Sequence, residues 1–88
     1  MAEYMVIERF RAGNSAAVYA RFTEKGRMLP EGLDFVASWL SGRDDTCWQV
    51  MRTQTPESFD KWTRHWDDLV DFEIIKLKEK QMTGSDNR

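Results

Sequence analysis

Residues 47–69, CWQVMRTQTPESFDKWTRHWDDL, hold the strand-to-helix transition that decides the fold. The segment 47–53 contains Trp, Val and Thr, which are residue types enriched in strands. Thr55 can then cap a helix and Pro56 suits a first helical position, so we predict that a helix begins there. The apolar side chains that follow recur at helical spacing and form one buried stripe, namely Phe59, Trp62, Trp66 and Leu69.

The segments on either side continue the alternation of strands and helices. The sequence predicts a helix over 15–26 and further strands over 4–10, 33–40 and 71–77. The turn formers SGRDD join the two middle strands as a hairpin. The resulting order is strand, helix, strand, strand, helix, strand, which is the split βαβ arrangement of ferredoxin-like folds.

We therefore predict an α+β sandwich in which right-handed crossovers place both helices on one face of a four-stranded antiparallel sheet. With 88 residues the chain has room for one domain, since independent cores usually need about 50 to 200 residues. We expect this ferredoxin-like domain to span residues 1–78. The polar segment 79–88 is expected to be a disordered tail.

The predicted strands are apolar on both faces. Adjacent side chains in a strand point to opposite faces. Both members of several adjacent pairs are nevertheless apolar, among them Val6 and Ile7, Phe35 and Val36, and Ile74 and Ile75. A sheet with one face in water alternates apolar and polar residues more cleanly than this. We therefore expect a homodimer in which a second copy covers the second face, sheet against sheet.

Charge and cysteine content limit the partners and the compartment. The formal net charge is −2 and the basic residues are scattered singly, which argues against a nucleic-acid partner. Cys47 is the single cysteine and cannot form an internal disulfide. The N-terminal residues show no signal-peptide pattern, and no apolar run approaches the roughly 18 residues that a membrane span needs. We expect a cytoplasmic protein that does not bind membranes.

Four runs of the sequence carry a family resemblance. YMVIERF, GRMLPEGLDFVASW, CWQVM and FDKWTRHWDDLVDFE, taken together, resemble the bacterial domain of unknown function 3303 family over nearly all of residues 4–77. This resemblance implies no particular activity.

A second, more distant resemblance is to the dimeric α+β barrel superfamily, which includes antibiotic-biosynthesis monooxygenases and haem-degrading monooxygenases. It rests on IERF at 7–10 and RTQTPESFDKW at 52–62. The resemblance implies a cavity between the sheet and the helices. The haem-degrading branch has Asn where Glu8 stands here and a haem-ligating His later in the second helix than His65, so we do not expect haem degradation.

Glu8 and His65 are the candidate catalytic residues. Glu8 interrupts an apolar strand, and in a closed interior it must be paired, protonated or functional, because an unpaired buried charge costs several kcal/mol. An acid or base role and a structural pair with Arg9 or Arg52 explain Glu8 equally well. His65, the only histidine, is expected at the edge of the apolar stripe, where it could shuttle a proton or simply bond to solvent or a carbonyl.

The candidate ligand-binding residues are aromatic or polar side chains that could line one pocket, namely Trp39, Gln49, Trp62, Trp66 and Arg27. Ser38 could add a further polar group. The alternative is that the indoles are core and that Arg27 lies in a connecting loop. We expect Cys47, which has no basic neighbour in sequence, to be an inert thiol.

Metal ligands are not expected. One histidine without a spaced second ligand matches no zinc site. The acidic residues near the end of the second helix are expected to pair with Arg21, Arg27 or Arg64 or to be hydrated, rather than to bind a divalent metal; they are Asp67, Asp68, Asp71 and Glu73. No cofactor is expected.

Two functional hypotheses stay open from the sequence. One is a homodimer that binds a small aromatic or hydrophobic molecule in a monooxygenase-like cavity and that could act without a cofactor. The other is a non-catalytic structural or regulatory dimer with no ligand site. RNA binding on the open sheet face is disfavoured, because CWQVMRT lacks the Lys/Arg-Gly-aromatic pattern of RNA-recognition motifs.

Overall fold

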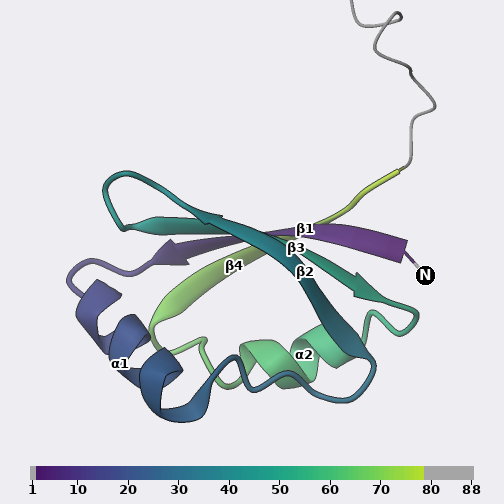
Figure 1. Ribbon diagram of the computed structural model, residues 1–88, viewed down its shortest axis with the longest axis horizontal. Coiled ribbons are helices and arrows are strands. Elements are labelled where there is room, and N and C mark those ends of the chain that lie inside the picture. The colour runs from purple at the N-terminus through teal and green to yellow at the C-terminus, as the bar shows by residue number, and fades with distance from the viewer. Residues whose placement is uncertain (1, 79–88) are drawn as a thin grey trace, which may run out of the picture.

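The structure, a computed structural model, describes residues 2–78, so the predicted tail 79–88 lies outside the described residues. Within this part of the chain, four strands and two helices follow in the predicted order (Figure 1). Their bounds are β1 Ala2–Phe10, α1 Ser15–Lys25, β2 Leu33–Leu40, β3 Thr46–Thr53, α2 Ser58–Thr63 and β4 Val70–Lys76. The strands pair antiparallel in the order β2-β3-β1-β4. This confirms the ferredoxin-like α+β fold.

Both helices lie on one side of the sheet, below it in Figure 1. The burial pattern of β1 shows which strand face meets the helices. Tyr4, Val6 and Glu8 of β1 are buried, whereas Met5 and Ile7 between them are only half-buried. The even-numbered side chains of β1 therefore face the helices. The buried apolar core comprises Tyr4, Val6, Val18, Leu33, Met51, Phe59, Trp62, Trp66 and Val70.

A β-bulge changes the facing of β2. The register shifts between Phe35 and Ala37, so that Ser38, and not its neighbour, pairs with the buried Gln49. A bulge adds one residue to one strand and so reverses the alternation beyond it. As a result Ser38 faces the helices, while Trp39 pairs with Trp48 on the opposite face.

The second helix is shorter than predicted. It begins at Ser58 and ends at Thr63, whereas the sequence predicted a helix from Thr55 and Pro56 through Leu69. Tight turns replace the missing helix: the Trp66 N–H donates to the Thr63 carbonyl and the Leu69 N–H to the Trp66 carbonyl. Bonds between residues three apart keep Phe59, Trp62 and Trp66 buried while they bring the chain into β4. The buried stripe of side chains was predicted correctly, but the backbone conformation after Thr63 was not.

The Thr53 hydroxyl ties together three segments. This fully buried residue ends β3, and its Oγ1 donates to the Gly32 carbonyl at 2.7 Å and accepts from the Thr55 N–H at 3.0 Å. The Thr55 N–H is therefore bonded to a side chain before the helix begins. Gly32 has φ 89°, a left-handed conformation that favours glycine. Neither described helix has the length and apolar character needed to cross a membrane.

Replacing Thr53 by Val should destabilise the protein by about 1 to 2 kcal/mol, because the shape is kept while the bonds of the hydroxyl to the Gly32 carbonyl and the Thr55 N–H are lost. Urea denaturation gives the free energy of unfolding. Thr46→Val, at the other end of β3, removes one exposed hydroxyl bond to Asp45 and should cost less than about 0.5 kcal/mol. Equal losses in both variants would contradict the role assigned to Thr53.

Candidate functional site

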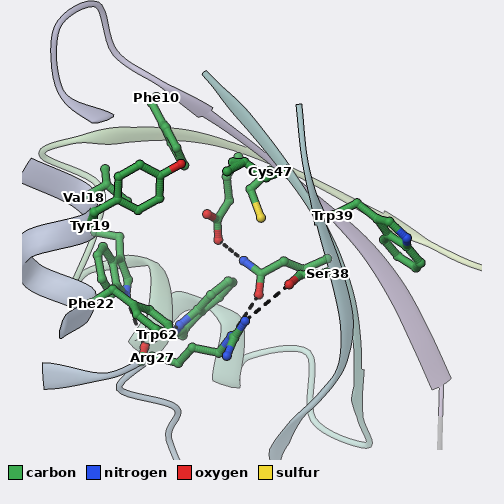
Figure 2. Close-up of a pocket in the computed structure, with 13 residues that line it drawn as sticks. Phe10, Val18, Tyr19, Phe22, Arg27, Ser38, Trp39, Cys47 and Trp62 are labelled. Atoms are coloured by element: carbon green, nitrogen blue, oxygen red, sulfur yellow. Dashed lines mark hydrogen bonds between the residues drawn. The ribbon is translucent and has the colours of Figure 1, made fainter. Parts of the chain in front are cut away.

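A cavity of about 240 Å³ lies between the helix-facing side of the sheet, α1 and the segment that begins with α2 (Figure 2). Most of its wall is apolar and aromatic, from Phe10, Val18, Tyr19, Phe22, Leu40, Trp62 and Trp66. Five polar or weakly polar side chains also line it, namely Glu8, Arg27, Ser38, Cys47 and Gln49. Apolar walls with a few converging polar groups are typical of small-molecule sites.

The polar side chains form one hydrogen-bonded row. Arg27 donates from Nε to Gln49 Oε1 at 3.2 Å and from Nη2 to Ser38 Oγ at 3.4 Å. Gln49 in turn donates from Nε2 to Glu8 Oε2 in a buried hydrogen bond. Figure 2 draws these bonds across the cavity. The row thus connects the loop after α1 to β1 through Gln49 of β3, while Ser38 of β2 bonds to Arg27 alone.

Glu8 is the ionisable group whose environment is most unusual. Its side chain is buried on β1, and this burial raises its pKa from 4.5 to about 7, since a charged carboxylate loses hydration there. The Arg27 charge and the bond from Gln49 act in the opposite direction but are weaker. A carboxyl that titrates near neutral pH can both accept and donate a proton there.

Arg27 is held at both its backbone and its side chain. Its carbonyl accepts the indole N–H of Trp62 at 2.9 Å and that of Trp66 at 3.2 Å. Its guanidinium carbon lies 3.6 Å from the ring centroid of Phe35, a cation–π contact. Met28, the next residue, has φ 60°, a left-handed conformation that costs a non-glycine residue about 1 to 2 kcal/mol. These contacts hold Arg27 at the cavity wall despite that cost.

Cys47 lies opposite Glu8 in the register between β1 and β3. Burial, followed by the nearby Glu8 charge, raises the pKa of its thiol to about 11. The thiol is therefore protonated at neutral pH, and a protonated thiol is a poor nucleophile. This agrees with the inert role expected from the sequence.

The structure brings together six of the side chains considered from the sequence as catalytic or ligand-binding groups, because Glu8, Arg27, Ser38, Gln49, Trp62 and Trp66 all line the cavity. The structural pairing of Glu8 with Arg9 or Arg52 is not observed. Those arginines pair with Glu73 and Glu3 at 3.0 and 2.7 Å.

Two other candidates lie elsewhere. Trp39 borders the cavity, but Figure 2 shows its ring pointing away from it, and 55% of the residue is exposed. The β2 bulge explains this orientation. His65 is exposed and does not line the cavity; its carbonyl accepts from Arg21 at 2.8 Å. The expectation that His65 lies at the edge of the buried face is corrected, because α2 ends before it.

The acidic residues near β4 are largely paired with arginines. Asp68 receives two bonds from Arg21 at 2.7 and 2.8 Å. Asp71 pairs with Arg11 at 3.1 Å, and Glu73 with Arg9. Arg21 was the only one of these partners expected from the sequence. Within residues 2–78, no group of His, Cys, Asp and Glu gathers where it could hold a metal ion.

Sequence reasoning missed the aromatic wall that α1 contributes. Tyr19 and Phe22 line the cavity and are about 40% exposed. Both lie in the helix predicted over residues 15–26, but neither was among the candidate ligand-binding residues. The sequence did contain a signal for this wall. Two aromatic residues stand three positions apart on a helix that otherwise has few large apolar side chains.

The fold and the cavity define a small ferredoxin-like α+β domain with a polar and aromatic cavity between its sheet and its helices. The family described as Domain of unknown function (DUF3303) matches residues 2–83, and the chain belongs to this family. The family expected from the sequence is thus confirmed, whereas the link to the dimeric α+β barrel superfamily stays a prediction. Comparisons with curated proteins and with solved structures gave no match.

The buried position of Glu8 predicts a pH-dependent stability. The folded state binds the Glu8 proton more tightly than the unfolded chain, so stability is lost as pH rises from 4.5 through about 7. In Glu8→Gln this loss is absent. The free energy of unfolding of the variant, relative to wild type, should therefore rise by on the order of 3 kcal/mol over this range. Urea denaturation at several pH values measures it.

Glu24→Gln, which removes an exposed carboxyl from α1, is the matched control for net charge. A difference between Glu8→Gln and wild type that stays constant from pH 4.5 to about 7 would show that burial does not perturb Glu8.

Proposed function

We propose that the protein binds a small aromatic or hydrophobic molecule in the cavity between its sheet and its helices. The observation that carries this proposal is the combination of aromatic walls with one buried, hydrogen-bonded carboxyl, Glu8. A buried charge is unfavourable for stability unless it is well paired, and here its direct partner is the neutral amide of Gln49. Such a placement is typical of functional sites.

The size of the cavity limits the ligand. At about 240 Å³ it lies below the roughly 300 to 1,000 Å³ of drug-sized sites. A compound with one or two fused rings suits this volume. Trp62 and Trp66 would contact its faces, and Gln49 and Arg27 would hold Glu8 in place.

Any proton transfer on a bound ligand would fall to Glu8, which is the only carboxyl among the lining side chains. Its pKa of about 7 suits an acid or base that needs no cofactor. The cavity also lies between sheet and helices, where the resemblance to the monooxygenase-containing superfamily implies a ligand site.

We also propose that the protein forms a homodimer through the sheet face opposite the helices. This open face carries Met5, Ile7, Trp39, Trp48, Val50 and Ile75, which follow one another through the strand register. Ion pairs border it at two ends, Arg9 with Glu73 and Arg52 with Glu3. An apolar centre with a charged rim is the usual composition of a protein interface. A second copy supplies the same pattern and closes the contact by two-fold symmetry.

A cytoplasmic location is part of the same proposal, since the single cysteine has no partner for an internal disulfide and its thiol is free. The competing hypothesis is a structural or regulatory dimer that uses the open face alone and has no ligand. Binding measurements on the cavity separate the two hypotheses, because only the first requires a ligand.

Filling the cavity should abolish ligand binding. Cys47→Phe introduces a ring into the space beside Glu8, whereas Cys47→Ser keeps the original size. Calorimetric titration with 2-naphthol should show a loss of affinity of about tenfold or more in Cys47→Phe and a change of less than about threefold in Cys47→Ser. Equal affinity in both variants would place the bound compound elsewhere.

A charge on the open face should weaken the dimer. Ile75→Lys places the charge beside Met5, whereas Ile74→Lys places it one residue away on the opposite face, where Ile74 pairs with Val6. The two residues are similarly exposed, at 43% and 37%. Sedimentation velocity should show a dimer that Ile75→Lys weakens by about tenfold or more and that Ile74→Lys leaves intact. A wild-type protein that sediments as a monomer at every concentration would refute the dimer.

A further inference from the structure

The donors of the cavity are mostly engaged within the protein. The indole N–H groups of Trp62 and Trp66 both donate to the Arg27 carbonyl. Arg27 directs its Nε and Nη2 to Gln49 and Ser38, and the Gln49 amide donates to Glu8. Of the other lining donors, Arg27 Nη1 and the Tyr19 hydroxyl make no hydrogen bond in the described part of the chain, so a ligand that needs more donors than these competes with existing bonds.

One strong acceptor is left for a ligand. Glu8 accepts from Gln49 through Oε2. No buried side-chain oxygen or nitrogen in the described part of the chain lacks a partner, and no hydrogen bond to Glu8 Oε1 is present there. Oε1 is therefore accessible and not fully buried. Because Glu8 lines the cavity, a ligand in the cavity can reach this oxygen.

The orientation of this acceptor is set by Arg27. The guanidinium donates to the carbonyl oxygen of the Gln49 amide, so the NH₂ group of the amide has to point toward Glu8. Glu8 Oε2 then accepts from Gln49, and Oε1 stays available as an acceptor at the cavity. Arg27 acts here as a positioning residue.

Building on the ligand site proposed above, we propose that its ligand is a neutral aromatic molecule that carries an O–H or N–H donor at its edge and donates it to Glu8. The rings lie against the aromatic wall of Tyr19, Phe22 and Trp62. The donor supplies the bond that Glu8 Oε1 lacks within the protein.

Charged ligands fit this arrangement less well. A carboxylate would meet the Glu8 carboxylate, and two of the donor nitrogens of Arg27 are already bonded. An ammonium group would share the cavity with the Arg27 guanidinium. A neutral donor meets neither repulsion, and it exploits the greater strength of hydrogen bonds to charged acceptors.

Two probes of similar shape and opposite hydrogen-bonding character test this inference. 2-Naphthol brings a donor, whereas in 2-methoxynaphthalene a methyl group replaces the hydroxyl hydrogen. Calorimetric titration at pH 8, above the Glu8 pKa of about 7, should show 2-naphthol binding about tenfold or more tightly to wild type. Naphthalene controls for ring contacts and naphthalene-2-carboxylate for an anion.

Glu8→Gln should remove the preference for 2-naphthol. In this variant the carbonyl oxygen of the new side chain accepts from Gln49, so its NH₂ group faces the cavity. The acceptor has become a donor, and the affinity ratio of 2-naphthol to 2-methoxynaphthalene should fall to about one or below. Glu24→Gln, which removes an exposed carboxyl outside the cavity and keeps Glu8, should retain the wild-type ratio.

The outcomes distinguish this inference from the ligand site on which it depends. Equal binding of both probes to wild type, or tightest binding of the carboxylate, would overturn the donor rule and leave an aromatic site. Binding of none of the four compounds would overturn both. Should Glu8→Gln not fold, wild type titrated from pH 8 to pH 6 gives a second test. Protonation of Glu8 turns the acceptor into a donor, so it should weaken 2-naphthol relative to 2-methoxynaphthalene, and parallel changes in the two affinities would overturn the donor rule.

Discussion

The alternation of side chains along β1 is the constraint on which the rest of the structure depends. Tyr4 and Val6 must be buried to form the core, and the two-residue period of a strand then carries Glu8 into the same interior. The carboxyl cannot be hydrated there as it would be at the surface. Gln49 on β3 bonds to it, and Arg27 orients Gln49 from the loop after α1. The cavity is thus built around a charge that the strand geometry places inside.

Arg27 joins this polar row to the packing of the core. Its carbonyl satisfies two indole N–H groups that would otherwise be buried without partners, and each such loss costs about 1 to 3 kcal/mol. Its side chain lies against Phe35 while it reaches across the cavity. One loop residue therefore couples the position of α2 to the orientation of the acceptor at Glu8. The helix-facing side of the sheet carries the cavity with its polar side chains, and the opposite side carries the exposed apolar surface.

Much of the fold could be predicted from local pattern. The order of the elements and the buried stripe of Phe59, Trp62 and Trp66 follow from periodicity and turn residues, and the four-stranded antiparallel sheet follows from that order. Gln49, Trp62 and Trp66 line one cavity beside Glu8, since polar residues within strands and aromatic residues of the buried stripe converge on the interior. The extent of α2 could not be predicted, because the residues between Thr63 and β4 form tight turns with bonds between residues three apart instead of further helix.

The sequence by itself determined the element order and the family, because these depend on which residue types recur at which spacing. Only the tertiary structure decided which candidates meet. The β2 bulge turns Trp39 outward and Ser38 inward, and the early end of α2 leaves His65 exposed. The loop after α1 brings Arg27 onto Gln49. Contacts between segments that are distant in the sequence set the bulge, the helix end and the path of the loop. The spacing of residues within one segment carries no information about those contacts.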